Sequence, residues 1–375
     1  MNKHSKIFVA GHNGLVGSAL MRALKEQGYT NIITRTHTEL DLVNQEQTDE
    51  FFAQNSPEYV FLSAALAGGI MANMSRKADF IYENSQIACN VIHSAYKYGV
   101  KKLLYLASTS IYPKNSALPT DENALWQGEL EYTNKAYAIA KLLGVSLCEN
   151  YNIQYKTNFL SIVPINLYGN DDKFDFKSAH VLPAMLRKFH LAKLLENSDI
   201  AGICDDLGIL DQNLAITELK KQGIEKGKIS IWGSGNAKRE FLHADDLAPA
   251  CLYVMNNLEF HQLITNSDEI KNTQLNVSSG SNISIKDLAY MIKEIVGFKG
   301  EIYFDTTKPE GIKERLTSSK KLQSLGWKPK ITLEKGVKDM YDWYVNTKNV
   351  QNSVGGGDCL NNKGHKLEFH SLKIA

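Results

Sequence analysis

The chain has 375 residues, and its 42 lysines and arginines nearly balance 41 aspartates and glutamates, giving a formal net charge of +1 at pH 7. This balance excludes the strongly basic composition expected of a nucleic-acid-binding chain and indicates no membrane partner. No segment approaches the roughly 18 consecutive apolar residues of a membrane span. The five cysteines are scattered without a C-x-x-C pair, which predicts reduced thiols in a cytoplasmic protein and no metal site.

Short apolar runs alternate with helix-length amphipathic segments through the first half of the chain. The apolar runs predict strands at 6–11, 31–35, 59–65, 102–108 and 157–166. The amphipathic segments predict helices at 18–27, 45–54, 78–99 and 137–151. This alternation implies right-handed crossovers and a parallel sheet. Because the strands are nearly continuous apolar runs, both faces of the sheet should be covered.

The pattern loosens beyond about residue 170. A helix is predicted at 180–195, and short strands at 228–233, around 274–279 and at 301–305. Between them, residues 197–228 form a polar insert with weak helical character. These elements suggest a smaller C-terminal lobe that is interleaved with the first. The residues from 346 to 375 include VGGGD and few apolar side chains, which predicts a flexible tail.

A glycine-rich loop follows the first predicted strand and opens the first predicted helix. Gly11, Gly14 and Gly17 form the stretch GHNGLVG, a G-x-x-G-x-x-G pattern. Glycines allow a tight turn and a close approach of the backbone to a pyrophosphate, whose charge then lies at the helix N-terminus. In many chains such a triplet is only a structural turn. Its place inside a β-α-β unit at the start of this chain predicts dinucleotide binding.

The end of the second predicted strand bears on which dinucleotide is bound. An acidic residue there would accept hydrogen bonds from the ribose 2′-hydroxyl of NAD. Here the stretch ITRTHTELDL places Arg35 and His37 first and has no acidic residue before Glu39. A cation favours a 2′-phosphate, so we expect NADP(H). The alternative is that Arg35 is a solvated surface residue. Asp41, farther along the same stretch, is expected near the adenine.

Tyr137 and Lys141 form a Y-x-x-x-K pattern in a predicted helix, so both side chains share one face. An ammonium beside a phenol should lower the phenol pKa from about 10, and such a tyrosine can exchange a proton with a substrate oxygen. Some thirty residues earlier, a predicted strand ends in three hydroxyls. Ser108 is expected beside Tyr137, because ligands bind beyond the carboxyl ends of parallel strands. Alternatively, one of these hydroxyls caps the turn before Pro113.

These elements together resemble the GDP-L-fucose synthase family of extended short-chain dehydrogenase/reductases. The resemblance covers roughly residues 5–345. It is carried by the stretches GHNGLVGSAL, AGGIMAN, ADFIYEN, STSIYPK, YAIAKLLGVSLCENYN, NLYG, HVLPAMLRKFH and WGSGNAKREFLHADDLA. It implies NADPH as cofactor, a nucleotide-sugar substrate and a homodimer.

The resemblance also implies a fold class and a domain division. The fold is α/β: a Rossmann-type doubly wound parallel sheet with a smaller C-terminal α/β lobe that binds substrate. Residues 1–170 would form the NADP(H)-binding domain, with later segments around 228–250 returning to it. Residues 171–345 would form mainly the substrate lobe, with the insert at about 197–228.

Site residues follow from the resemblance by position. The catalytic residues would be Ser108, Tyr137, Lys141 and His180. The cofactor would contact Gly11, Asn13, Gly14, Leu15, Val16, Gly17, Arg35, Asp41, Leu42, Ala64, Ala65, Lys141, Pro164, Asn166, Leu167 and His180. The substrate would contact Ser108, Thr109, Ser110, Tyr137, Asn166, Lys188, Trp232 and Arg239. Lysine and arginine suit the diphosphate, and an indole can pack on a flat or apolar face.

The chain departs from the family pattern at several positions. Ser110 stands where bifunctional members carry a cysteine, which works with a histidine matched here by His180 to epimerise the carbons beside the ketone. A thiol ionises near pH 8.5, whereas an alcohol does not near neutrality. Asn13 and His37 stand where some members carry arginines on the 2′-phosphate. The long insert could reshape the sugar pocket for a heptose, or be an inert surface loop.

The sequence therefore predicts an NADPH-dependent reductase acting on the C4 ketone of a GDP-4-keto-6-deoxy-sugar, hexose or heptose, with epimerase activity weak or absent. Three alternatives stay open. The chain could be a full epimerase/reductase in which another group replaces the thiol. It could be a nucleotide-sugar 4-epimerase with tightly held NAD, or a non-catalytic NADP(H)-binding regulator.

Overall fold

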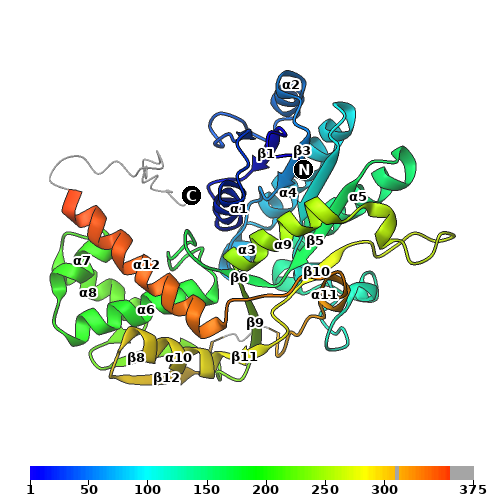
Figure 1. Ribbon diagram of the computed structural model, residues 1–375. Helices are drawn as coiled ribbons and strands as arrows, with labels where there is room; N and C mark the ends of the chain where they lie inside the picture. Colours follow the sequence, from blue (N-terminus) through cyan, green and yellow to red (C-terminus); the bar gives the residue numbers. More distant parts are fainter. Residues whose placement is uncertain (309–311, 355–375) are drawn as a thin grey trace, which may run out of the picture.

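The structure, a computed structural model, describes residues 1–308 and 312–354. A six-stranded parallel sheet forms the larger part of the molecule (Figure 1). Its strands lie in the order β10-β5-β4-β3-β1-β2. Their bounds are β1 Ile7–Ala10, β2 Ile32–Ile33, β3 Tyr59–Leu62, β4 Lys102–Leu106, β5 Phe159–Pro164 and β10 Leu275–Val277. The prediction of a Rossmann-type doubly wound parallel sheet is confirmed.

Alternate side chains of these strands point to opposite faces of the sheet, and each face packs against its own layer of helices. In β1, Ile7 and Val9 pack against α1 and α9, whereas Phe8 contacts the opposite helical layer. The first layer consists of α1 (Leu15–Glu26) and α9 (Ala244–Asn257). The second consists of α2 (Gln45–Asn55), α4 (Lys77–Lys97) and α5 (Lys135–Tyr155). Both faces are therefore buried, as the continuous apolar strands predicted.

A second group of elements packs around its own core below the carboxyl ends of the sheet (Figure 1). Two three-stranded sheets belong to it, in the orders β11-β9-β6 and β12-β8-β7. Their strands are β6 Asn166–Tyr168, β9 Lys238–His243, β11 Asn282–Ser284, β7 Ile224–Glu225, β8 Lys228–Trp232 and β12 Glu301–Asp305. The helices around them are α6 Val181–Glu196, α10 Ile285–Val296 and α12 Leu333–Val354.

The stretch 228–250 contributes to two cores. The first core lies between the large sheet and helices α1 and α9, and the second core is that of the second group of elements. Ile229 and Ile231 of β8 are buried in the second core, whereas Leu247 and Ala250 of α9 are buried against α1 and the large sheet. Only the later part of this stretch therefore returns to the first layer. The late strand β10 returns as well, because it pairs in parallel with β5.

The insert consists of two helices, α7 (Ile200–Leu207) and α8 (Gln212–Lys221), which is more order than its polar sequence predicted. Ile203 and Leu219 are buried in the second core. Asp206 is buried as well, and its carboxylate accepts hydrogen bonds from Arg187 Nε at 2.7 Å and from the Tyr344 hydroxyl. This buried polar contact fixes α7 against α6 and α12.

The C-terminal boundary also differs from the prediction. The tail was expected from residue 346, but α12 continues to Val354, and residues 355–375 lie outside the described part of the chain. The sequence analysis did not predict β9, α9, α10 or α12, although the buried residues of α10 (Ile285, Leu288, Ala289, Ile292 and Val296) recur at helical spacing. None of the helices in the described ranges is long and apolar enough to cross a membrane.

We expect Gly144→Ala to destabilise the protein, although alanine favours helices by about 1 kcal/mol over glycine. A Cβ at position 144 of α5 would lie 2.2 Å from Cζ of Tyr105, whose ring is buried against the helix. Overpacking of this kind costs about 1–3 kcal/mol. Urea unfolding should show a lower midpoint for the variant. Adding Tyr105→Leu should recover part of that loss; equal or higher stability of Gly144→Ala alone would contradict the expectation.

Candidate active site

The glycine loop lies between β1 and α1 and forms a tight backbone cradle. Gly11 has φ +80°, and a Cβ there would lie 2.8 Å from the backbone of Ala64 after β3. A Cβ on Gly17 would lie 2.0 Å from the Gly11 carbonyl oxygen. Gly14 donates its N–H to the same oxygen at 3.0 Å and precedes the first turn of α1. The loop and the end of β3 are thus in direct contact, and neither Gly11 nor Gly17 can carry a side chain.

Arg35 and Asp41 lie beyond β2, at the edge of the same sheet. Arg35 is exposed, donates to the Thr34 carbonyl at 2.8 Å and has its guanidinium 5.7 Å from the centre of the Phe51 ring. The Asp41 carboxylate accepts the Val43 N–H at 3.0 Å, and Leu42 is buried. An exposed guanidinium at this edge is compatible with a 2′-phosphate, and the contact of Arg35 with the cofactor stays a prediction.

The hydroxyl cluster forms a short 3-10 turn, η1 (Thr109–Ile111), directly after β4. Ser108 Oγ accepts the Ser110 N–H at 3.3 Å and caps this turn, so the capping alternative holds for Ser108. That bond uses an acceptor lone pair and leaves the Ser108 O–H free to donate to a ligand. Ser110 is buried, and its Oγ has no hydrogen-bond partner among the described residues.

Tyr137 and Lys141 share one face of α5, which contacts η1. Lys141 Nζ donates to the Leu106 carbonyl at 2.7 Å, lies 5.0 Å from the centre of the buried Tyr105 ring and 5.8 Å from that of Tyr137. Burial lowers the pKa of Lys141 to about 7 and raises the pKa of Tyr137. The expected lowering of the Tyr137 pKa by the ammonium is therefore not seen in the chain alone, because desolvation is the cause that shifts this pKa.

His180 precedes α6 at the end of a connection from β6. Solvent reaches its ring, yet the surrounding protein atoms, and then the charge of Lys173, lower its pKa. Nearby in the chain, β5 ends at Pro164 and Asn166 begins β6, where its amide donates to the Glu240 carbonyl at 3.0 Å. Leu167 packs against the first core.

Lys188 and Trp232 lie in the second group of elements. Lys188 Nζ donates to the Ser230 carbonyl at 2.5 Å, and burial lowers its pKa to about 8. Trp232, on β8, is 50% exposed, so part of its indole is accessible to a ligand. Lys308 Nζ lies 6.0 Å from the centre of that ring. A flat aromatic surface and nearby ammonium groups suit a nucleotide.

Arg239 and Arg315 bring two guanidinium groups close together. Arg239 donates to the Ile312 carbonyl at 2.6 Å, and Arg315 donates to the Thr109 carbonyl at 3.2 Å. Burial, and then the charge of Arg239, lower the pKa of Arg315. Arg315 therefore reaches from the irregular segment before Lys320 to the hydroxyl turn, where a dianionic ligand would relieve the repulsion between the two guanidinium groups. The sequence analysis missed Arg315, because it lies in an irregular segment and its contact spans 206 residues.

The chain thus offers a cradle for a dinucleotide, a half-buried tyrosine paired with a buried lysine beside a hydroxyl turn, and, apart from them, cationic side chains and a half-exposed indole. The glycine cradle fits a pyrophosphate, because side chains are excluded where the backbone must approach it. Within the described ranges, no group of histidines, cysteines and acidic residues could hold a metal ion. This combination of fold and side chains defines a dinucleotide-dependent oxidoreductase.

The chain belongs to the NAD dependent epimerase/dehydratase family, whose model matches residues 7–207 and 208–264, and to the GDP-L-fucose synthase-like proteins within it. GDP-L-fucose synthase 1 of Arabidopsis thaliana is 45% identical over 94% of this chain and 96% of its own length. GDP-L-fucose synthase of Escherichia coli is 39% identical over 91% and 96%.

Solved structures that are similar to this chain include two reductases from Campylobacter jejuni. One is a GDP-6-OMe-4-keto-L-xylo-heptose reductase, with a TM-score of 0.90 and 46% identity over 92% of this chain and 99% of that one. The other is a GDP-mannoheptose C4 reductase with NADP bound, with a TM-score of 0.83 and 46% identity over the same shares. The family resemblance noted in the sequence is confirmed.

Proposed function

We propose that the chain catalyses the NADPH-dependent reduction of the C4 ketone of a GDP-4-keto-6-deoxy-sugar, a hexose or a heptose, with epimerase activity weak or absent. The hydroxyl of Ser110 at the position of the family thiol is the observation that carries the second part. The reductase part is supported by the pair of the half-buried Tyr137 with the buried Lys141 and by relatives that reduce GDP-linked sugars. A homodimer stays a prediction from the resemblance.

The residues have separate tasks in this scheme. The hydride comes from bound NADPH, and the proton comes from the chain. Tyr137 donates that proton to the ketone oxygen, and Ser108 donates a hydrogen bond to the same oxygen while its Oγ keeps the cap on η1. Lys141 stabilises the phenolate. Because its pKa is about 7, about half of the protein molecules carry a charged Lys141 at neutral pH. Arg239 and Arg315 hold the diphosphate.

Epimerisation needs a base that removes a proton from the carbon beside the ketone. Ser110 is an alcohol whose buried Oγ has no acceptor among the described residues, so nothing there assists its ionisation. His180 is present with a lowered pKa and could act as one base of an exchange. This histidine and the fucose synthases among the relatives favour the bifunctional enzyme as the second candidate.

Turnover in heavy water separates the two candidates. We expect the wild type to consume NADPH with a GDP-4-keto-6-deoxy-sugar and to leave C3 and C5 of the product free of deuterium by NMR. Ser110→Cys should gain deuterium at these carbons, whereas the matched variant Ser110→Ala should reduce the ketone without exchange. Deuterium entering C3 or C5 of the wild-type product at the rate of NADPH consumption would reject the reductase-only proposal.

A further inference from the structure

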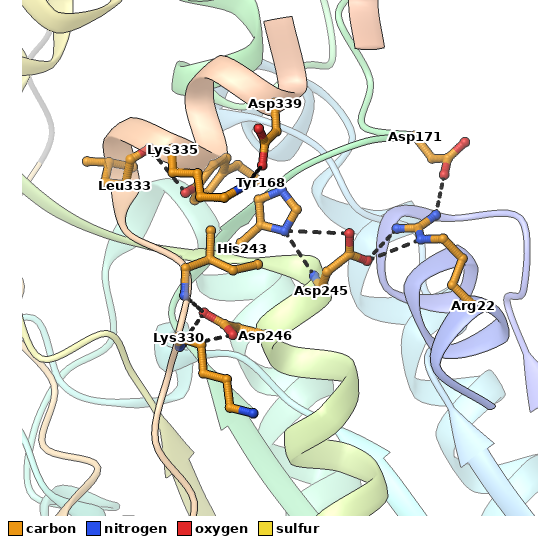
Figure 2. A network of polar contacts seen from close by, with 11 residues as sticks. Arg22, Tyr168, Asp171, His243, Asp245, Asp246, Lys330, Leu333, Lys335 and Asp339 are labelled. Carbon is orange, nitrogen blue, oxygen red and sulfur yellow. Dashed lines mark hydrogen bonds and ion pairs between the residues drawn. The ribbon is translucent and has the colours of Figure 1, made fainter. Parts of the chain in front are cut away.

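The guanidinium of Arg22 joins three segments that are far apart in the sequence (Figure 2). Arg22 lies on α1, the helix that begins at the glycine loop. Its Nε and Nη2 donate to Asp245 Oδ1 at 3.2 and 2.6 Å, at the start of α9. Its Nη1 donates to Asp171 Oδ2 at 2.8 Å, in the connection after β6. Asp245 thus orients the guanidinium so that its remaining edge faces Asp171.

Asp171 belongs to the connection 169–180, which leads from β6 to α6. Its φ of +67° lies in the left-handed region, where a residue with a side chain is disfavoured unless its surroundings hold it. Beside it, a Cβ on Gly169 would lie 3.1 Å from Nε2 of the buried His243, so the backbone here passes close to that ring. The Arg22 ion pair therefore holds a backbone position that the chain would not favour by itself.

The other end of the connection contacts the segment after β3. Ser178 accepts the N–H of Gly69 through its carbonyl at 2.9 Å, and a Cβ on Gly69 would lie 2.8 Å from the Ala179 carbonyl oxygen. His180 follows directly. The connection is thus held at one end by the cofactor helix and at the other by the segment after β3, with His180 at its last position.

We propose that Arg22 is a positioning residue, which fixes the 169–180 connection to the cofactor helix and so links NADPH binding to the placement of His180 and of the substrate side. This inference rests on the proposed function. Any movement of α1 on NADPH binding would reach Asp171 through the single Arg22–Asp171 ion pair, while the Asp245 pair orients the guanidinium. No other charged pair in the described ranges joins α1 to this connection.

The ion pairs of Arg22 are too exposed to contribute much to the free energy of unfolding. The side chain of Arg22 is 40% exposed, and those of Asp171 and Asp245 are 22% and 35% exposed. Ion pairs with this much solvent access add little to the free energy of unfolding, because solvent screens them. Their loss should therefore change the geometry of the connection more than the unfolding midpoint.

The test compares Arg22→Gln, Asp171→Asn and the double variant. Asparagine tolerates the left-handed backbone, so Asp171→Asn removes the charge and keeps the local conformation. Lys97→Gln is the matched control, because it breaks the Lys97–Asp49 pair of 2.9 Å with side chains 49% and 33% exposed, away from the connection. Steady-state kinetics and hydrogen exchange of the amides of 169–180, with and without NADPH, are measured on the full chain.

We expect each single variant to lower kcat about tenfold and the double variant to lower it no further, since both remove one interaction. Lys97→Gln should keep wild-type kcat. NADPH should protect the 169–180 amides in the wild type and in Lys97→Gln, and should lose this effect in Arg22→Gln. Unchanged kcat in the single variants, multiplied losses in the double variant, or equal protection by NADPH in Arg22→Gln would overturn the proposal.

The two measurements keep this inference separate from the proposed function. If the wild type reduces none of the GDP-4-keto-sugars, the proposed function fails. The exchange experiment uses NADPH alone as its probe and still decides whether Arg22 links the cofactor helix to the connection.

Discussion

Replacing Tyr137 with phenylalanine is expected to lower kcat about a thousandfold, because the variant cannot donate a proton to the ketone oxygen. The phenyl ring keeps the volume of the side chain and its edge-on contact with Phe80, whose ring centre lies 6.2 Å away. Stability and NADPH affinity should therefore change little. NADPH consumption with a GDP-4-keto-sugar measures the loss, and fluorescence titration with NADPH measures the affinity.

Tyr132→Phe is the control for this substitution. Tyr132 lies five positions earlier, is 68% exposed, and its ring faces Lys77 Nζ at 3.8 Å, so it also combines a phenol with a lysine. This variant should retain the wild-type rate. If Tyr137→Phe turned over as fast as Tyr132→Phe, proton donation by Tyr137 would be refuted, whichever sugar is used.

The second large effect is expected at the glycine cradle. Gly17→Ala should weaken NADPH binding about a hundredfold, equivalent to about 2.7 kcal/mol, because its Cβ would lie 2.0 Å from the Gly11 carbonyl oxygen and 2.6 Å from the His12 Cα. Both neighbours are backbone atoms, so the loop itself must move. Isothermal titration with NADPH measures the affinity, and urea unfolding reports whether the variant is folded.

Gly14→Ala keeps this prediction testable if Gly17→Ala does not fold. A Cβ at position 14 meets only the Gly11 carbonyl oxygen, at an ordinary 3.5 Å, so this variant should fold normally. Weakened NADPH binding by folded Gly14→Ala would then report on the approach of the pyrophosphate. Wild-type affinity in both variants would contradict a role of this loop in cofactor binding.

The alternation of strands and helices in the first half could be predicted because periodicity is a local property. Predicted and observed boundaries of β1, α4 and β4 differ by two residues at most. Strand boundaries were predicted less well where pairing between distant segments determines them. The strand predicted at 157–166 ends at Pro164, and β6 begins at Asn166 to pair with β9, about seventy residues later. Strand β9 was not predicted, because its pairing with β6 and β11 joins segments that are distant in the sequence.

In the candidate site, too, local motifs could be predicted from the sequence and long-range contacts could not. The glycine loop, Tyr137 and Lys141 could be identified from spacing, because each motif lies within one turn or one helix. The pKa of Tyr137 could not, since its direction depends on how much protein surrounds the phenol. Arg315 could not be identified either, because no pattern near it indicates that it contacts the carbonyl of Thr109.

The place of β10 in the large sheet has a consequence for how this protein is made. This strand lies beside β5 and is built from residues 275–277, after most of the second core has been translated. During translation, the outer edge of β5 therefore stays unpaired until residues 275–277 leave the ribosome. An unpaired edge of that kind favours aggregation, so a fragment cut near residue 170 would be a poor candidate for separate expression.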